Sequence, residues 1–155
     1  MSASPFDQRS WRLPLRESRR PRPRVRASGP RSMPDSDPPV FDPAVLDELR
    51  RATGGDDAFV KELIGTYLAD GAVLLETIAA ALQAGDGAAV VRPAHTLKSS
   101  SASLGAMRLA ELSRGLEEDG RTGSAMDPGR VAHLRSEWSA ASAALAGAAS
   151  GVHEP

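Results

Sequence analysis

The chain has 155 residues, which is enough for one hydrophobic core of ordinary size but too few for two well-built domains. It contains no cysteine, so disulfides, thiolate zinc sites and thiol nucleophiles are excluded. The net charge of −1 hides an asymmetry, because residues 1–31 carry nine arginines against two acidic side chains, whereas residues 42–155 carry ten basic and sixteen acidic side chains.

Residues 1–40 are rich in Arg, Pro and Ser and show no apolar periodicity, so we expect them to be disordered. The pair Arg19 and Arg20 is not followed by the apolar run of a twin-arginine signal. Two interpretations of this segment stay open. It is either a dispensable leader, with Met33 as the true start, or a basic arm that binds nucleic acid or anionic lipid.

A first helix is expected at residues 43–51, because Asp42 can cap it, Pro43 suits its first position and Phe41 can pack on Leu46. A long second helix follows and ends near Gly85. Its apolar residues recur at helical spacing: Phe59, Leu63, Tyr67, Leu74, Ile78 and Leu82. The apolar stretches are interrupted well before the roughly 20 residues that a membrane span requires, so we expect no membrane-spanning segment.

A third helix is expected from about Asp86 to Ser103. It carries a narrow apolar stripe: Val90, Ala94, Leu97, Ser101 and Leu104. Pro93 lies inside this helix and should kink its axis, unless the helix proper begins near Arg92.

A fourth helix is expected to stop near Gly120, and a fifth to begin at Asp127 and Pro128. Their apolar stripes comprise Leu109, Leu112 and Leu116 in the fourth and Val131, Leu134, Trp138, Ala141 and Leu145 in the fifth. Helices of this length joined by short links predict an all-α fold, an up-and-down four-helix bundle over residues 41–147. The short first helix should cover one end, residues 148–155 should fray, and we expect a monomer.

One histidine of the third helix stands out. His95 follows Ala94 of the apolar stripe by one position and so points about 100° away from that stripe. Lys98 and Ser99 share its face, and Ala102 lies one turn further along. Neutral imidazole is a nucleophile at pH 7, and a neighbouring ammonium can stabilise the charge of a transferring phosphoryl group. The pattern therefore predicts phosphoryl transfer through His95.

The string His95-Thr-Leu-Lys-Ser-Ser-Ser101, followed by Leu104-Gly105, resembles the motif of the histidine-containing phosphotransfer (HPt) family, His-x-Leu-Lys-Gly-Ser-Ser/Ala. The similarity covers residues 41–147. Ser99 replaces the family's glycine, but serine is small enough to let a partner approach.

The resemblance implies that His95 takes a phosphoryl group from the aspartyl phosphate of one receiver domain and passes it to another, with Lys98 beside the phosphate. It also implies that Glu117 holds one ring nitrogen, that Arg121 lies nearby, and that Val91, Ser99 and Ala102 border the partner's contact. The partners would be response regulators or hybrid histidine kinases in a bacterial cytoplasm. Magnesium would belong to the receiver, so we expect no metal or cofactor on this chain. The sequence contains no glycine-rich phosphate-binding loop, so we expect no kinase or ATPase activity of its own.

Other interpretations remain open at this point. The chain could be a helical adaptor of the same fold that Pro93 has made inactive, or a nucleic-acid-binding protein that uses its basic arm. Glu117 and Arg121 could form an ordinary exposed helix pair. His133 and Glu137 have a spacing that suits a metal, but two ligands make an incomplete site.

Overall fold

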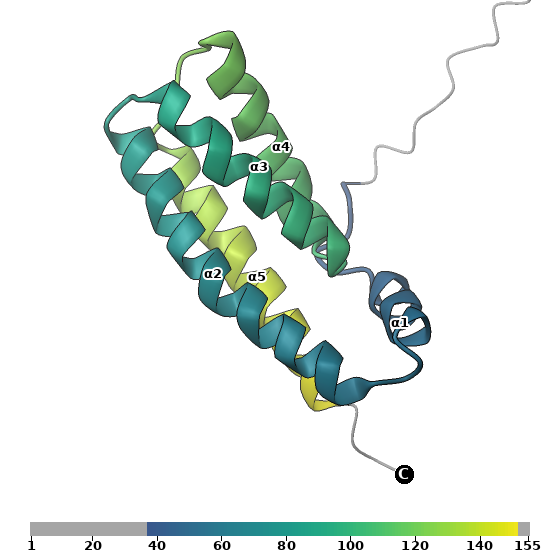
Figure 1. Cartoon of the computed structure of the whole chain (residues 1–155). Coiled ribbons are helices and arrows are strands. Elements are labelled where there is room, and N and C mark those ends of the chain that lie inside the picture. Colours follow the sequence, from purple (N-terminus) through teal and green to yellow (C-terminus); the bar gives the residue numbers. More distant parts are fainter. Residues whose placement is uncertain (1–36, 152–155) are drawn as a thin grey trace, which may run out of the picture. The chain divides into compact units, whose positions relative to one another are not determined.

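The computed structural model describes residues 37–151, and within that range the chain forms five α-helices and no strands (Figure 1). The helices are α1 (Pro43–Ala52), α2 (Asp57–Gln83), α3 (Gly87–Ser103), α4 (Met107–Thr122) and α5 (Arg130–Ser150). The expected all-α fold is confirmed for these residues. The disorder expected for residues 1–36 and the fraying expected at residues 152–155 lie outside the described residues.

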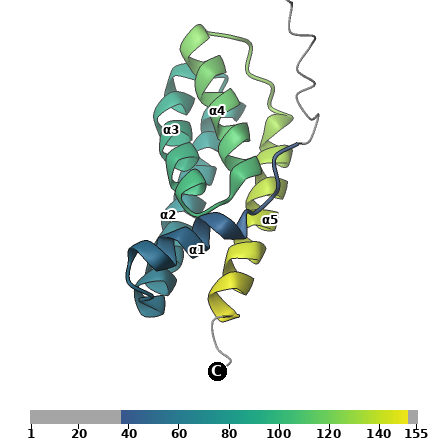
Figure 2. The ribbon, with the colours of Figure 1, turned by 90° about the vertical axis from the view of Figure 1, so that its right-hand side faces the viewer.

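The four long helices pack around one core. Helix α2 contacts α3 and α5, and α4 contacts the same two helices from the other side (Figures 1 and 2). The expected stripe of α3 is buried throughout, at Val90, Ala94, Leu97, Ser101 and Leu104. Because this stripe faces the core, the opposite face of α3 is left at the surface.

The expected stripe of α2 is wrong in its first turns. Phe59 is 46% exposed, whereas the adjacent Val60 is buried, as is Ile64. The buried positions continue through Tyr67, Gly71, Leu75, Ile78 and Leu82. The adjacent apolar residues Phe59 and Val60 allow two rotations of α2, and the buried Gly71 has no side chain that could mark its position as part of the core.

Helix α2 is long and apolar enough to cross a membrane by length and composition, with a mean hydropathy of 1.4 over its most apolar 18 residues. The core helix of a helical protein meets the same criterion. One third of that stretch is buried, and the buried residues of α2 pack against α3 and α5.

Helix α1 lies beside the turn that joins α3 to α4 (Figures 1 and 2). The Asp42 carboxylate caps α1 by accepting from the Ala44 backbone N–H at 3.0 Å, and the Asp42 N–H donates to the Gly105 carbonyl at 2.8 Å. Arg108 donates through its backbone N–H to the Pro39 carbonyl at 3.1 Å. Residues 37–40, assigned to the disordered segment by sequence, therefore include backbone that is bonded to α4.

Helix α3 begins at Gly87 and contains Pro93, so the alternative start near Arg92 is wrong. The Asp86 carboxylate caps it by accepting from the Ala89 N–H at 3.0 Å. Helices can accommodate an interior proline when packing offsets the lost hydrogen bond, and here the flanking Val90 and Ala94 are both buried.

Helix α5 differs from expectation at both ends. It begins at Arg130 because the Asp127 carboxylate accepts from the Gly129 N–H at 2.8 Å, which holds a turn rather than a helix cap. It continues to Ser150, three residues past the expected boundary, because Ala148 and Ala149 pack against the core. The Arg50 guanidinium also donates to the Ala148 carbonyl at 3.2 Å.

Helices α3 and α4 approach closely at Gly120. A Cβ built there would lie 2.6 Å from the Gly87 carbonyl oxygen and 2.8 Å from Cγ2 of Val91, so no larger residue fits without a shift of α3 or α4. Since Gly120 lies less than one turn beyond Glu117, this contact brings the Glu117 side chain within reach of α3.

Candidate functional site

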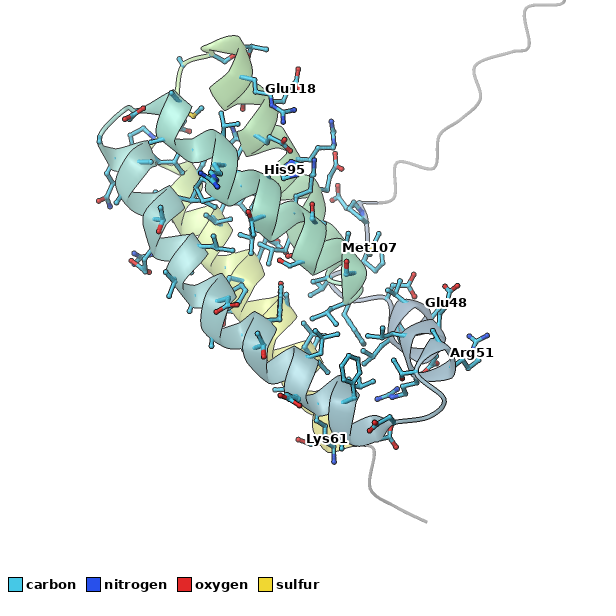
Figure 3. All side chains as sticks on the ribbon, in the orientation of Figure 1. Glu48, Arg51, Lys61, His95, Met107 and Glu118 are labelled. Carbon is cyan, nitrogen blue, oxygen red and sulfur yellow. The ribbon has the colours of Figure 1, made fainter. Side chains whose placement is uncertain are left out.

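His95 lies on the outer face of α3 (Figure 3), and its side chain is 55% exposed. The neighbouring Ala94 and Leu97 are fully buried, which fixes the rotation of the helix about its axis. The imidazole is therefore both accessible to a partner and anchored on a helix that cannot turn.

Glu117 reaches the same place from α4. Its side chain is only 3% exposed. The Nδ1 atom of His95 lies 2.8 Å from Oε1 of this carboxylate, and Nζ of Lys98 lies 2.6 Å from Oε2. The Arg121 guanidinium also pairs with Oε1. A buried carboxylate is costly unless it is paired, and here three donors from two helices surround it.

These contacts keep Glu117 ionised. The hydrogen bond from Lys98, and next the one from His95, lower the pKa of Glu117 from its ordinary 4.5 to about 2. An ionised carboxylate can only accept hydrogen bonds, so Nδ1 of His95 must carry the proton in this contact. In the neutral ring the lone pair then resides on Nε2, which makes no hydrogen bond to the described residues.

The surface around the imidazole is low. Ser99 and Ala102 are exposed, and Val91 is half-buried. The Ser99 hydroxyl donates back to the His95 carbonyl at 3.0 Å, so it adds little height beside the ring. Another protein surface can therefore approach the ring closely on this side.

The structure thus brings His95, Lys98, Glu117 and Arg121 into one cluster. The interpretation of Glu117 and Arg121 as an exposed pair does not hold, because Glu117 is buried. Sequence reasoning passed over Arg92, an exposed cation three residues before His95. The three-residue spacing that pointed to Lys98 after His95 also points to Arg92 before it.

A model of the Hpt domain matches residues 62–144, more than half of the chain, and the matched range contains all four clustered residues. The chain belongs to the Hpt domain family. The family resemblance drawn from the motif at His95 is thereby confirmed.

A solved structure supports the same assignment for the fold. The Hpt domain described here is similar to histidine-containing phosphotransfer protein B (HptB) from Pseudomonas aeruginosa PAO1, with 27% sequence identity and a TM-score of 0.66. The match covers 74% of this chain and 98% of the HptB chain. No curated protein sequence matches the chain significantly.

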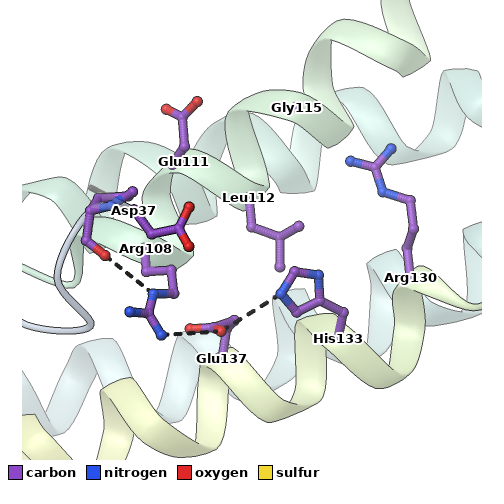
Figure 4. A pocket seen from close by; sticks show the side chains of 9 residues that line it. Asp37, Arg108, Glu111, Leu112, Gly115, Arg130, His133 and Glu137 are labelled. Carbon is purple, nitrogen blue, oxygen red and sulfur yellow. Dashed lines mark hydrogen bonds and ion pairs between the residues drawn. The ribbon is translucent and has the colours of Figure 1, made fainter. Parts of the chain in front are cut away.

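The pair His133 and Glu137 lies elsewhere in this Hpt domain, beside a pocket of about 360 Å³ between α4 and α5 (Figure 4). Nε2 of His133 is 3.6 Å from Oε1 of Glu137, and the Arg108 guanidinium lies 3.8 Å from the same oxygen. Among the described residues, no three histidine or acidic side chains are grouped to hold a metal ion. The cation nearest to the Glu137 oxygen is instead the Arg108 guanidinium.

Proposed function

We propose that this Hpt-domain protein acts in a phosphorelay, in which His95 accepts a phosphoryl group from the aspartyl phosphate of one receiver domain and passes it to another. The observation that carries this proposal is the contact of Nδ1 with Glu117, which leaves the accessible ring with its lone pair on Nε2. Membership of the Hpt family and the similarity to HptB support it.

In the forward step, Nε2 attacks the phosphorus atom, a nitrogen–phosphorus bond forms, and the bond from phosphorus to the receiver's carboxylate oxygen breaks. The carboxylate leaves without needing a proton. The imidazole ring gains positive charge, which the ionised Glu117 faces across 2.8 Å. The reverse sequence of bond changes delivers the group to a second receiver.

Lys98 and Arg121 would stabilise the phosphoryl oxygens. Both are bound to Glu117, yet Arg121 is well exposed and Lys98 partly so, which lets either side chain reach outward while Glu117 stays paired with the other. Charge stabilisation and positioning provide most of the catalysis in phosphoryl transfer. The chain needs no metal for this role, because the magnesium ion would be held by the receiver.

The partner would cover the low surface formed by Val91, Ser99 and Ala102, in the short-lived and modest contact typical of signalling proteins. We further propose that the four long helices form the up-and-down four-helix bundle expected from sequence, and that the protein works as a monomer in the cytoplasm. The packing of α2 and α4 against both α3 and α5 supports the bundle.

Incubation with receiver domains labelled from acetyl [³²P]phosphate tests the transfer. We expect an acid-labile, base-stable label that disappears in His95→Gln. The matched control is His133→Gln, since His133 is equally exposed on α5 and should leave the label unchanged. Receiver binding without any label would favour the inactive adaptor, and a label that persists in His95→Gln would refute the assignment of His95.

A further inference from the structure

Three cations border the imidazole of His95, but they are not equivalent. Lys98 and Arg121 are both bound to Glu117 on the α4 side. Arg92 is exposed, and its guanidinium makes no ion pair or hydrogen bond within residues 37–151. It is therefore the cation beside His95 that is free to engage another molecule.

The geometry of α3 places this free charge on the side of the ring away from Glu117. At about 100° per residue, Arg92 and Lys98 lie roughly 60° to either side of His95 when viewed along the helix axis. Lys98 faces α4, so Arg92 is displaced toward α2. Helices α2 and α3 run antiparallel (Figure 1), and the Tyr67–Ser101 hydrogen bond of 2.9 Å sets their register.

That register places Val73 of α2 level with His95. Val73 is 67% exposed and carries no charge, so this part of α2 offers Arg92 no carboxylate. The nearby Glu76 is paired with Arg135 of α5 at 3.0 Å. Asp70, one turn before Val73, lines the groove between α2 and α3 beside Thr96 and Ser100, but it makes no ion pair with Arg92. The Arg92 guanidinium therefore has no acidic partner among the described residues.

We propose that Arg92 is a docking residue, whose guanidinium pairs with the carboxylates that border the phosphorylated aspartate of a receiver domain. This inference rests on the proposed function. A receiver's acidic pocket must come within bonding distance of Nε2 during transfer, and an unpaired arginine one turn away meets such a pocket with complementary charge. The alternative is that Arg92 binds the phosphoryl group after its transfer to His95, and the phosphoramidate measurement below distinguishes this role from docking.

The experiment compares Arg92→Gln and Arg92→Glu with the wild-type protein in transfer from a phosphorylated receiver. We expect kcat/KM to fall about three-fold on neutralisation and about ten-fold on charge reversal at low ionic strength. The loss should shrink at high salt, because exposed charges are screened. The matched control is Lys61→Gln, which removes one exposed positive charge at the N-terminal end of α2, well away from His95 (Figure 3).

A second measurement uses phosphoramidate, a small donor that phosphorylates histidine without a receiver. Arg92→Gln should take up this label at the wild-type rate and hold it for as long. Equal losses with phosphoramidate and with the receiver would mean that Arg92 acts on the phosphoryl group or the imidazole, and would overturn the docking role. Unchanged receiver transfer in both Arg92 variants, or an equal loss in Lys61→Gln, would also overturn it. Failure of the wild-type protein to accept a phosphoryl group from any receiver would instead overturn the proposed function, and this inference with it.

Discussion

Gly71 is the position at which α2 receives the indole ring of Trp138. A Cβ built on Gly71 would lie 2.5 Å from Cζ3 of Trp138 and nearer still to Cη2, far inside van der Waals contact. The indole cannot move freely, because it packs against the Tyr67 ring with a centroid separation of 5.5 Å. Gly65, earlier on the same helix, has open space where its Cβ would be.

The pair Gly65→Ala and Gly71→Ala therefore separates two opposing effects. Alanine in a helix interior is favoured over glycine by about 1 kcal/mol, and overpacking a core costs about 1–3 kcal/mol. Gly65→Ala gains the first effect alone, so its free energy of unfolding should rise by about 1 kcal/mol. Gly71→Ala incurs both, so its free energy of unfolding should be about 1–3 kcal/mol lower than that of Gly65→Ala.

Urea unfolding followed by far-ultraviolet circular dichroism measures both variants. The two substitutions are chemically identical and lie on one helix, so their difference reports the contact with Trp138. If Gly71→Ala were stabilised as much as Gly65→Ala, the indole would be moving aside at no cost, and the argument that Gly71 is a core position would be refuted.

Two further predictions concern the paired carboxylate and the α3–α4 turn. Because the pKa of Glu117 is lowered from 4.5 to about 2, its ionised form contributes stability that is fully present above about pH 4.5 and is lost as pH falls toward 2. In urea unfolding across that pH range, the free energy of unfolding of the wild-type protein should fall more steeply than that of Glu117→Gln. Parallel pH curves of the two proteins would contradict this. The pKa of Glu111 is also lowered, but Glu111 titrates in both proteins, so its contribution cancels in the comparison. At the turn, Gly105 has a φ of +84° and its Cβ would meet the Asp42 carbonyl, whereas Gly123 has a φ of +70° and open space. Gly105→Ala should therefore cost more than Gly123→Ala, which pays only the left-handed strain of about 1–2 kcal/mol, and equal losses in urea unfolding would show that the contact with Asp42 is unimportant.

The sequence predicts an element well where its local signals agree. Helix α3 begins one residue after Asp86, where its start was expected, and its one narrow apolar stripe is buried as expected. Helix α2 has apolar residues at adjacent positions, Phe59 and Val60, so the spacing alone fits two rotations about its axis. Contact with α3 and α5 selects between them, and that contact cannot be derived from the periodicity of α2 alone.

In the site, too, local sequence predicts some residues, whereas others depend on contacts between helices. His95 and Lys98 share a helix, so their proximity follows from helical geometry. Glu117 is 22 positions further along, and sequence reasoning reached it only through the resemblance to a family. An acidic residue is expected at the surface unless it has partners, and those partners are specified by how α4 is rotated and how close it lies to α3.

The site meets two requirements that oppose each other. A phosphoryl acceptor must be open to a partner, and an exposed histidine on a single helix would be free to change its tautomer and its rotamer. Glu117 resolves this conflict because it is 3% exposed while the ring that it holds is 55% exposed. Glu117 is buried where α3 and α4 meet, and the absence of a side chain at Gly120 lets α4 approach α3 closely there. In the proposed transfer, the motif on α3 supplies the nucleophile, and the contact with Glu117 of α4 leaves the lone pair of the neutral ring on Nε2.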